Sequence, residues 1–166
     1  MDEARRSEAG FTLVEALTAI VVLSLGIMAV ANLFLVATTS NSVAGMGSAS
    51  TGIASEVMDA LKAQDYTTLL GAVGGNLVAD AGATLRPCES YSVAANPGVY
   101  NCDSDVAGVG RIHARWQIST DNAAPGNQDV LFVQVQAEAT GALGPARTRA
   151  SFTMFRTCSD GSVGCP

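Results

Sequence analysis

The sequence predicts an α+β fold in which one long N-terminal helix packs on a small antiparallel sheet. Three observations support this prediction. A long apolar block lies near the N-terminus, an amphipathic stretch with helical spacing continues from it, and three alternating segments separated by turn formers follow in the second half. With 166 residues, the chain is long enough for one modest domain and an accessory segment.

The apolar block begins after a short, charged segment at residues 1–10, which we expect to be a cytoplasmic leader peptide. Residues 11–37 form the transmembrane half of the predicted helix, because the run exceeds the ~20 residues that span a bilayer. A secretory signal peptide has its small-residue cleavage site after the apolar core, whereas Gly10 precedes it. Cleavage at Gly10 would therefore leave the apolar helix on the mature protein.

Charge predicts the orientation of this single span. Arg5 and Arg6 lie just before it, and the next basic residue after it is Lys62. Positive charge stays on the cytoplasmic side, so the N-terminus is expected in the cytoplasm and the C-terminus outside.

Glu15 lies inside the apolar run. A carboxylate at the centre of a membrane helix costs about 2.5–3.5 kcal/mol, and less near the interface. Two interpretations remain open from the residues alone. Glu15 is an interfacial acid that favours the positive end of the helix, or it awaits a positive partner.

Residues 38–64 continue the helix in amphipathic form. Apolar side chains recur at intervals of three, four and seven, namely Val43, Met46, Ile53, Val57, Ala60 and Leu61. We expect one helix from about Phe11 to about Gln64, ~80 Å long at 1.5 Å per residue.

Residues 65–110 are rich in glycine and proline and are predicted to form an irregular connector. Residues 111–166 are predicted to form the antiparallel sheet and a C-terminal disulfide loop. Strands are expected at Arg111–Ile118, Asp129–Glu138 and 149–156, because apolar residues alternate in each. The amphipathic helix would cover their apolar face.

Four cysteines lie in the polar part of the chain, at Cys88, Cys102, Cys158 and Cys165. An even number there favours disulfides and an oxidising compartment. A zinc site is the alternative, but no two cysteines have the spacing of a zinc knuckle. The favoured pairing is Cys88–Cys102 with Cys158–Cys165, since both close short loops. Cys88–Cys165 with Cys102–Cys158 is the rival.

Nothing in the sequence predicts catalysis, a metal or a cofactor. His113 is expected on the polar face of its strand, exposed and without a chemical role. Asp103 and Asp105 suggest calcium, but their segment lacks the further ligands and the turn glycine of a loop site. The net charge of -6, without a basic cluster, argues against nucleic acid as the main partner.

The N-terminal motif carries a specific resemblance. The run GFTLVE, from Gly10 to Glu15, followed by an uninterrupted apolar helix, resembles the class III signal of type IV pilins and type II secretion pseudopilins over residues 5–37. The resemblance implies that a prepilin peptidase cleaves between Gly10 and Phe11 and methylates the new amine of Phe11. It also implies that Glu15 pairs with the Phe11 amine of a neighbouring subunit, which would reduce the desolvation cost of both charges.

The resemblance further implies the type IV pilin fold, with residues 65–110 as the αβ-loop, and a structural subunit rather than an enzyme. Many major pilins have proline at the twenty-second mature position, whereas this chain has Asn32. That difference favours a minor pilin or pseudopilin over a main shaft subunit. Together with the helix length and the late cysteines, it makes the chain most similar to a minor pilin of the PilV type, which would take part in priming or tip assembly of a pilus used in adhesion or motility. A minor pseudopilin of type II secretion, or an adhesin at the tip, is the alternative.

The implied partners are other minor and major pilins, the prepilin peptidase, the inner-membrane assembly platform and a tip adhesin. The implied location is the inner membrane, with the head in the periplasm, and then the pilus at the cell surface.

Overall fold

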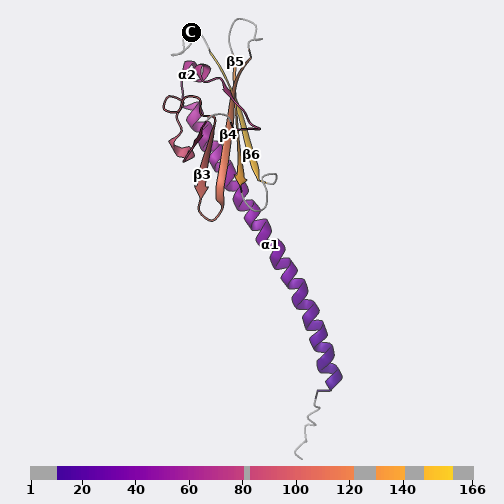
Figure 1. Cartoon of the computed structure of the whole chain (residues 1–166). Coiled ribbons are helices and arrows are strands. Elements are labelled where there is room, and N and C mark those ends of the chain that lie inside the picture. Colours follow the sequence, from indigo (N-terminus) through magenta and orange to yellow (C-terminus); the bar gives the residue numbers. More distant parts are fainter. Residues whose placement is uncertain (1–10, 81–82, 122–129, 141–147, 159–166) are drawn as a thin grey trace, which may run out of the picture. The chain divides into compact units, whose positions relative to one another are not determined.

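The computed structural model describes residues 11–80, 83–121, 130–140 and 148–158 (Figure 1). Their elements are the helices α1 (Leu13–Lys62) and α2 (Tyr66–Gly71), the strands β1 (Gly74–Gly75) and β2 (Thr84–Leu85), the short 3-10 helix η1 (Cys88–Ser90), and the strands β3 (Asn101–Val106), β4 (Gly110–Asp121), β5 (Val130–Thr140) and β6 (Arg149–Thr157). The predicted α+β class is confirmed. The chain divides into two compact units, residues 1–41 and 42–166.

In the first unit, the described residues form the beginning of α1. This part is long and apolar enough to cross a membrane, with a mean hydropathy of 2.6 over 18 residues, none of them buried. Its few hydroxyl groups bond back to the helix itself. Thr18 donates to the carbonyl oxygen of Glu15 at 3.0 Å, and Ser24 donates to that of Val21 at 2.8 Å. These two hydroxyls are therefore satisfied without water, which suits an apolar surrounding.

In the second unit, the remainder of α1 packs against the sheet. Its buried side chains share one face and are Ser50, Ile53, Ala54, Val57, Met58 and Leu61. They belong to the same core cluster as the inward side chains of the strands. Figure 1 shows this part of α1 behind β3, β4 and β6, so the helix covers one face of the sheet.

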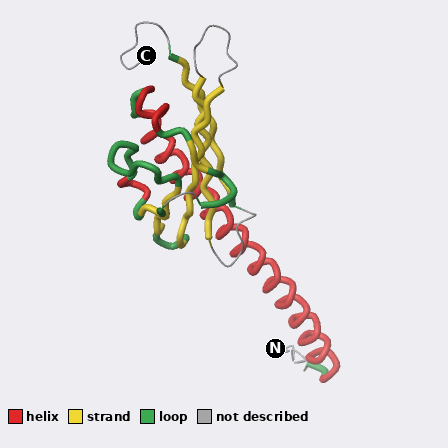
Figure 2. The backbone as a smooth tube through the Cα atoms, turned by 45° about the horizontal axis from the view of Figure 1, so that its top comes forward, coloured by secondary structure: helices red, strands yellow, loops and turns green. Residues whose placement is uncertain are grey.

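The sheet has the strand order β2-β3-β4-β5-β6, and β1 pairs with β4 outside this path. Strands β3 to β6 are antiparallel neighbours, whereas β2 runs parallel to β3. Figure 2 shows the strands as one layer beside the red helix. The sheet is therefore a mixed one built around an antiparallel meander.

The alternation predicted for the long strands is confirmed. The inward residues of β4 and β5 are at most 1% exposed. They are Ile112, Ala114, Trp116, Ile118, Leu131, Val133, Val135 and Ala137. The indole of Trp116 packs 4.4 Å from the Tyr91 ring, measured between centroids. Burial raises the pKa of Tyr91 to about 12.

Strand β3 lies inside the segment that the sequence predicted to be irregular. Its residues, NCDSDV, have low strand propensity, so the sequence carries no alternating apolar signal there. The segment is extended because it pairs with β4 from Asn101↔Arg115 to Val106↔Gly110. Tertiary pairing with a strong neighbouring strand outweighs local propensity.

Hydrogen bonds at two places also join α1 and the residues just after it to β6 and to Thr148, the residue before β6. The buried Ser50 hydroxyl donates to the carbonyl oxygen of Thr148 at 3.2 Å. At the other end, the Arg156 guanidinium donates to the carbonyl oxygen of Gln64 and, at 3.5 Å, to that of Lys62. These hydrogen bonds therefore hold the helix to the sheet at both ends of β6.

Candidate functional site

The first turn of α1 has a defined cap. The backbone N–H of Glu15 donates to the Thr12 hydroxyl at 3.3 Å, and Thr12 lies three residues before Glu15. A threonine followed three residues later by glutamate is the pattern of a capping box. The cap places the Glu15 carboxylate in the first turn, where the positive end of the helix dipole favours an acid.

Glu15 is open to its surroundings. It lies along a shallow groove with Phe11, Thr18, Ala19, Val22 and Leu23. Phe11 is 82% exposed. Within the part of the chain that the structure describes, no ion pair includes Glu15. The expected cleavage residue Gly10 lies outside the described residues.

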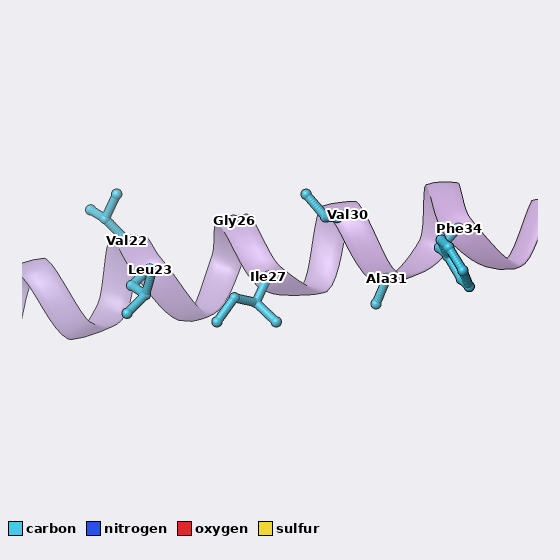
Figure 3. Close-up of a pocket in the computed structure, with 7 residues that line it drawn as sticks. All are labelled: Val22, Leu23, Gly26, Ile27, Val30, Ala31 and Phe34. Atoms are coloured by element: carbon cyan, nitrogen blue, oxygen red, sulfur yellow. The ribbon is translucent and has the colours of Figure 1, made fainter.

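A second open groove follows along the same helix. Figure 3 shows the residues that line this groove. They precede and follow Gly26 along the helix and are Val22, Leu23, Ile27, Val30, Ala31 and Phe34. A Cβ atom built at Gly26 would meet nothing within 4 Å. Only dispersion and hydrophobic contacts are available on this surface, so it suits lipid tails or another apolar helix.

The disulfide between Cys88 and Cys102 joins η1 to β3, with 5.1 Å between the Cα atoms. Both cysteines are buried, at 2% and 0% exposure. Cys158 is also disulfide-bonded. Its expected partner, Cys165, lies outside the described residues, so the second pairing stays a prediction.

The outer face of the sheet, away from α1, carries a continuous chain of ionic contacts. Basic and acidic side chains alternate along it. Its order is Arg111, Asp105, Arg86, Asp103, His113, Asp80, Arg115, Glu138 and Arg149. Four of these residues, Asp103, His113, Glu138 and Arg149, are cross-strand partners in one row over β3, β4, β5 and β6. The strand register therefore builds the chain of contacts.

Two carboxylates of this ionic chain, Asp80 and Glu138, are held in their charged form. Hydrogen bonds from Arg115 and His113 lower the pKa of Asp80. Burial by itself raises the pKa of Glu138, but hydrogen bonds from Arg115, at 2.6 Å, and Arg149, at 3.1 Å, outweigh it and lower that pKa. Burial opposes the charge of Arg115 too, yet bonds to Glu138 and Asp80 raise the pKa of Arg115.

The structure bears on the expectations for His113 and for the carboxylates Asp103 and Asp105. The expectation that His113 is exposed is wrong, because it is only 8% exposed and lies among carboxylates. Its partner Asp103 lies on β3, the strand that the sequence did not predict. Nothing in the sequence therefore indicated the contact between the two side chains. Arg86 lies 3.5 Å from Asp103 and 3.1 Å from Asp105, so both carboxylates pair with a guanidinium.

An exposed aromatic pair lies toward the other end of the outer face. Phe132 of β5 and Phe155 of β6 are direct cross-strand partners. They are 37% and 72% exposed, and Ser119 of β4 continues the row. Exposed aromatic pairs of this kind are typical of surfaces that contact another protein.

Comparison with known proteins identifies one feature. A family model described as the prokaryotic N-terminal methylation motif matches residues 5–31. No curated protein and no solved structure matched the chain. The motif, with the long apolar helix and the sheet, makes the architecture type IV pilin-like. It implies processing by prepilin peptidase and assembly with other pilins, and it points to a structural subunit rather than an enzyme.

Proposed function

We propose that this chain, whose N-terminal motif and architecture are those of a type IV pilin or pseudopilin subunit, is a minor pilin of the PilV type. It would take part in priming or tip assembly of a type IV pilus. The observation that carries the proposal is the N-terminal motif at residues 5–31 on an exposed apolar helix whose capped first turn contains Glu15.

The chemistry of maturation would begin at Gly10. A residue without a side chain can enter a narrow protease subsite beside the membrane. Cleavage between Gly10 and Phe11 would create a new amine, which the same enzyme would methylate. The exposed Phe11 and Glu15 then bring a cation and an anion to the same end of the helix.

Pairing between subunits would decide the register. The Glu15 carboxylate of one subunit would meet the Phe11 amine of its neighbour when apolar helices pack side by side. Each charge is tolerable at the membrane surface and costly in a dry bundle unless it is matched. The apolar groove around Gly26 would supply the lateral contact.

The minor role rests on the helix itself. Helix α1 runs from Leu13 to Lys62 without a proline, and Asn32 occupies the position where many major pilins have one. A minor pilin would be stored in the inner membrane, with its head in the periplasm, before assembly by the inner-membrane platform with other pilins. The exposed Phe132 and Phe155 pair favours a second candidate, a tip-located binding module.

A deletion strain would test the proposal. Loss of this subunit should reduce the number of surface pili and leave type II secretion at its normal level. Complementation with the wild-type chain should restore the pili, and the subunit should be found in sheared filaments. Normal pili with defective secretion would instead assign the chain to the type II system. Normal pili that fail to bind a surface would favour the adhesin.

A further inference from the structure

The ionic chain on the outer face has His113 at its centre. Four residues precede it and four follow it, and the two residues beside it are both carboxylates, Asp103 and Asp80. The position of His113 in the alternating order is that of a cation. Each flanking group of four contains two guanidinium groups and two carboxylates, so neither group has spare positive charge to place there.

Both ring nitrogens of His113 face oxygen. Nδ1 lies 2.5 Å from Asp103 Oδ1, and Nε2 lies 2.8 Å from Asp80 Oδ1. A neutral imidazole has only one N–H, so it can donate to one carboxylate and must turn a lone pair toward the other. An imidazolium donates to both. With the His113 side chain 9% exposed, water has little access to relieve a mismatched contact.

Asp80 belongs to the part of the connector that follows β1. Few apolar contacts hold this part, since Val78 is 88% exposed. The local bond from the Val78 N–H to Asn76 does not reach the sheet. The ion pairs of Asp80 with His113, and with Arg115 at 2.7 Å, are the polar contacts that bring this stretch to β4.

We propose that protonated His113 is a pH-sensitive clasp that fastens the connector at Asp80 to the sheet. Loss of the Nε2 proton would leave Asp80 with Arg115 alone, while the remaining N–H still donates to Asp103. The ionic chain would then separate into two balanced halves, and residues 76–80 would open more often. The remaining neighbour across the strands is Glu138 of β5, whose carboxylate is engaged by Arg115 and Arg149.

This inference does not depend on filament assembly, so the full mature chain in detergent micelles can test it. His113 is the only histidine, and a ¹⁵N-histidine label therefore reports on it alone. While residues 76–80 are held to β4, both ring nitrogens should carry protons. As the pH rises and one proton leaves, amide exchange at residues 76–80, corrected for its intrinsic rate, should accelerate about tenfold. Exchange in β5 should not change.

Three variants complete the test. Asp80→Asn should give fast exchange at residues 76–80 whatever the protonation of the ring. His113→Gln should abolish the pH dependence of that exchange. Asp59→Asn removes a carboxylate that forms an ion pair with Lys62 on α1, and it should behave like the wild type. Exchange at residues 76–80 that ignores the ring's titration would overturn the clasp.

Discussion

Arg156 of β6 donates hydrogen bonds to the backbone carbonyl oxygens of Gln64 and Lys62, where α1 ends. The last carbonyl groups of a helix have no partner within the helix and carry the negative end of its dipole. A guanidinium from the sheet therefore satisfies the end of α1 with both charge and hydrogen bonds.

Replacing the Arg156 side chain should lower the stability of the second unit, residues 42–166, which is the head of the subunit. We expect Arg156→Ala to lower the free energy of unfolding by about 1–2 kcal/mol, and Arg156→Lys to lower it by less, because it keeps the charge. Urea unfolding of the mature chain in micelles, followed by the fluorescence of the single tryptophan, Trp116, would measure both. Lys62→Ala is the control. Its ion pair with Asp59 is exposed, so its effect should be near zero.

Removing the disulfide between Cys88 and Cys102 should also destabilise the head. The bond closes a sequence separation of 14, and the double change to serine should lower stability by about 2–3 kcal/mol.

Non-reducing peptide mapping tests the second pairing. After cleavage between Cys102 and Cys158, the two halves separate if Cys158 pairs with Cys165. Halves that stay joined would disprove the local pairing.

Stability should fall in acid. The folded head lowers the pKa of Asp80 and of Glu138, so their contribution is present above the ordinary carboxylate values, about 3.9–4.3. It is lost as the pH falls through the lowered folded values. The urea midpoint should therefore drop steeply below about pH 4. Glu138→Gln should make this slope shallower, and an unchanged slope would contradict the assignment.

Maturation should require Gly10. We expect Gly10→Val to leave the precursor uncleaved in the inner membrane, because the added side chain blocks the protease subsite. The intact mass of the purified protein is the measurement. Gly26→Val adds the same bulk where a Cβ atom meets nothing within 4 Å, and it should be processed normally. A mature chain that begins anywhere but Phe11 would refute the site.

Assembly should require the charge of Glu15. Both Glu15→Val and Glu15→Gln should insert into the membrane, since insertion becomes easier without the charge. Their incorporation should fall because the Phe11 amine of a neighbour loses its partner. The ratio of subunit in sheared filaments to subunit in membranes decides this. Asp59→Asn, an exposed change elsewhere on α1, should be incorporated as the wild type is.

The elements with a periodic apolar signal could be predicted from sequence. Helix α1 was expected at about 11–64 and is observed at Leu13–Lys62, and β4, β5 and β6 lie within a few residues of their predicted bounds. Each has a side-chain period that only one secondary structure satisfies. The N-terminal site was visible for a different reason, because its residues are consecutive in the chain.

The polar face of the head could not be predicted in the same way. His113 and Asp80 are 33 positions apart, and Asp103 lies on a strand without apolar alternation. Their meeting depends on strand register and on the path of the connector. Neither is encoded in local propensity, so a histidine that looked solvated is in fact enclosed by carboxylates.

The bond from Ser50 to Thr148 joins residues 98 positions apart, and that of Arg156 to Gln64 joins residues 92 apart. By contrast, β3 to β6 are consecutive antiparallel neighbours. Loops that close over short distances lose less entropy, so the meander should form early and the helix should dock on it late. The sheet can therefore reach its native register first, and docking of the part of α1 after residue 42 then completes the second unit.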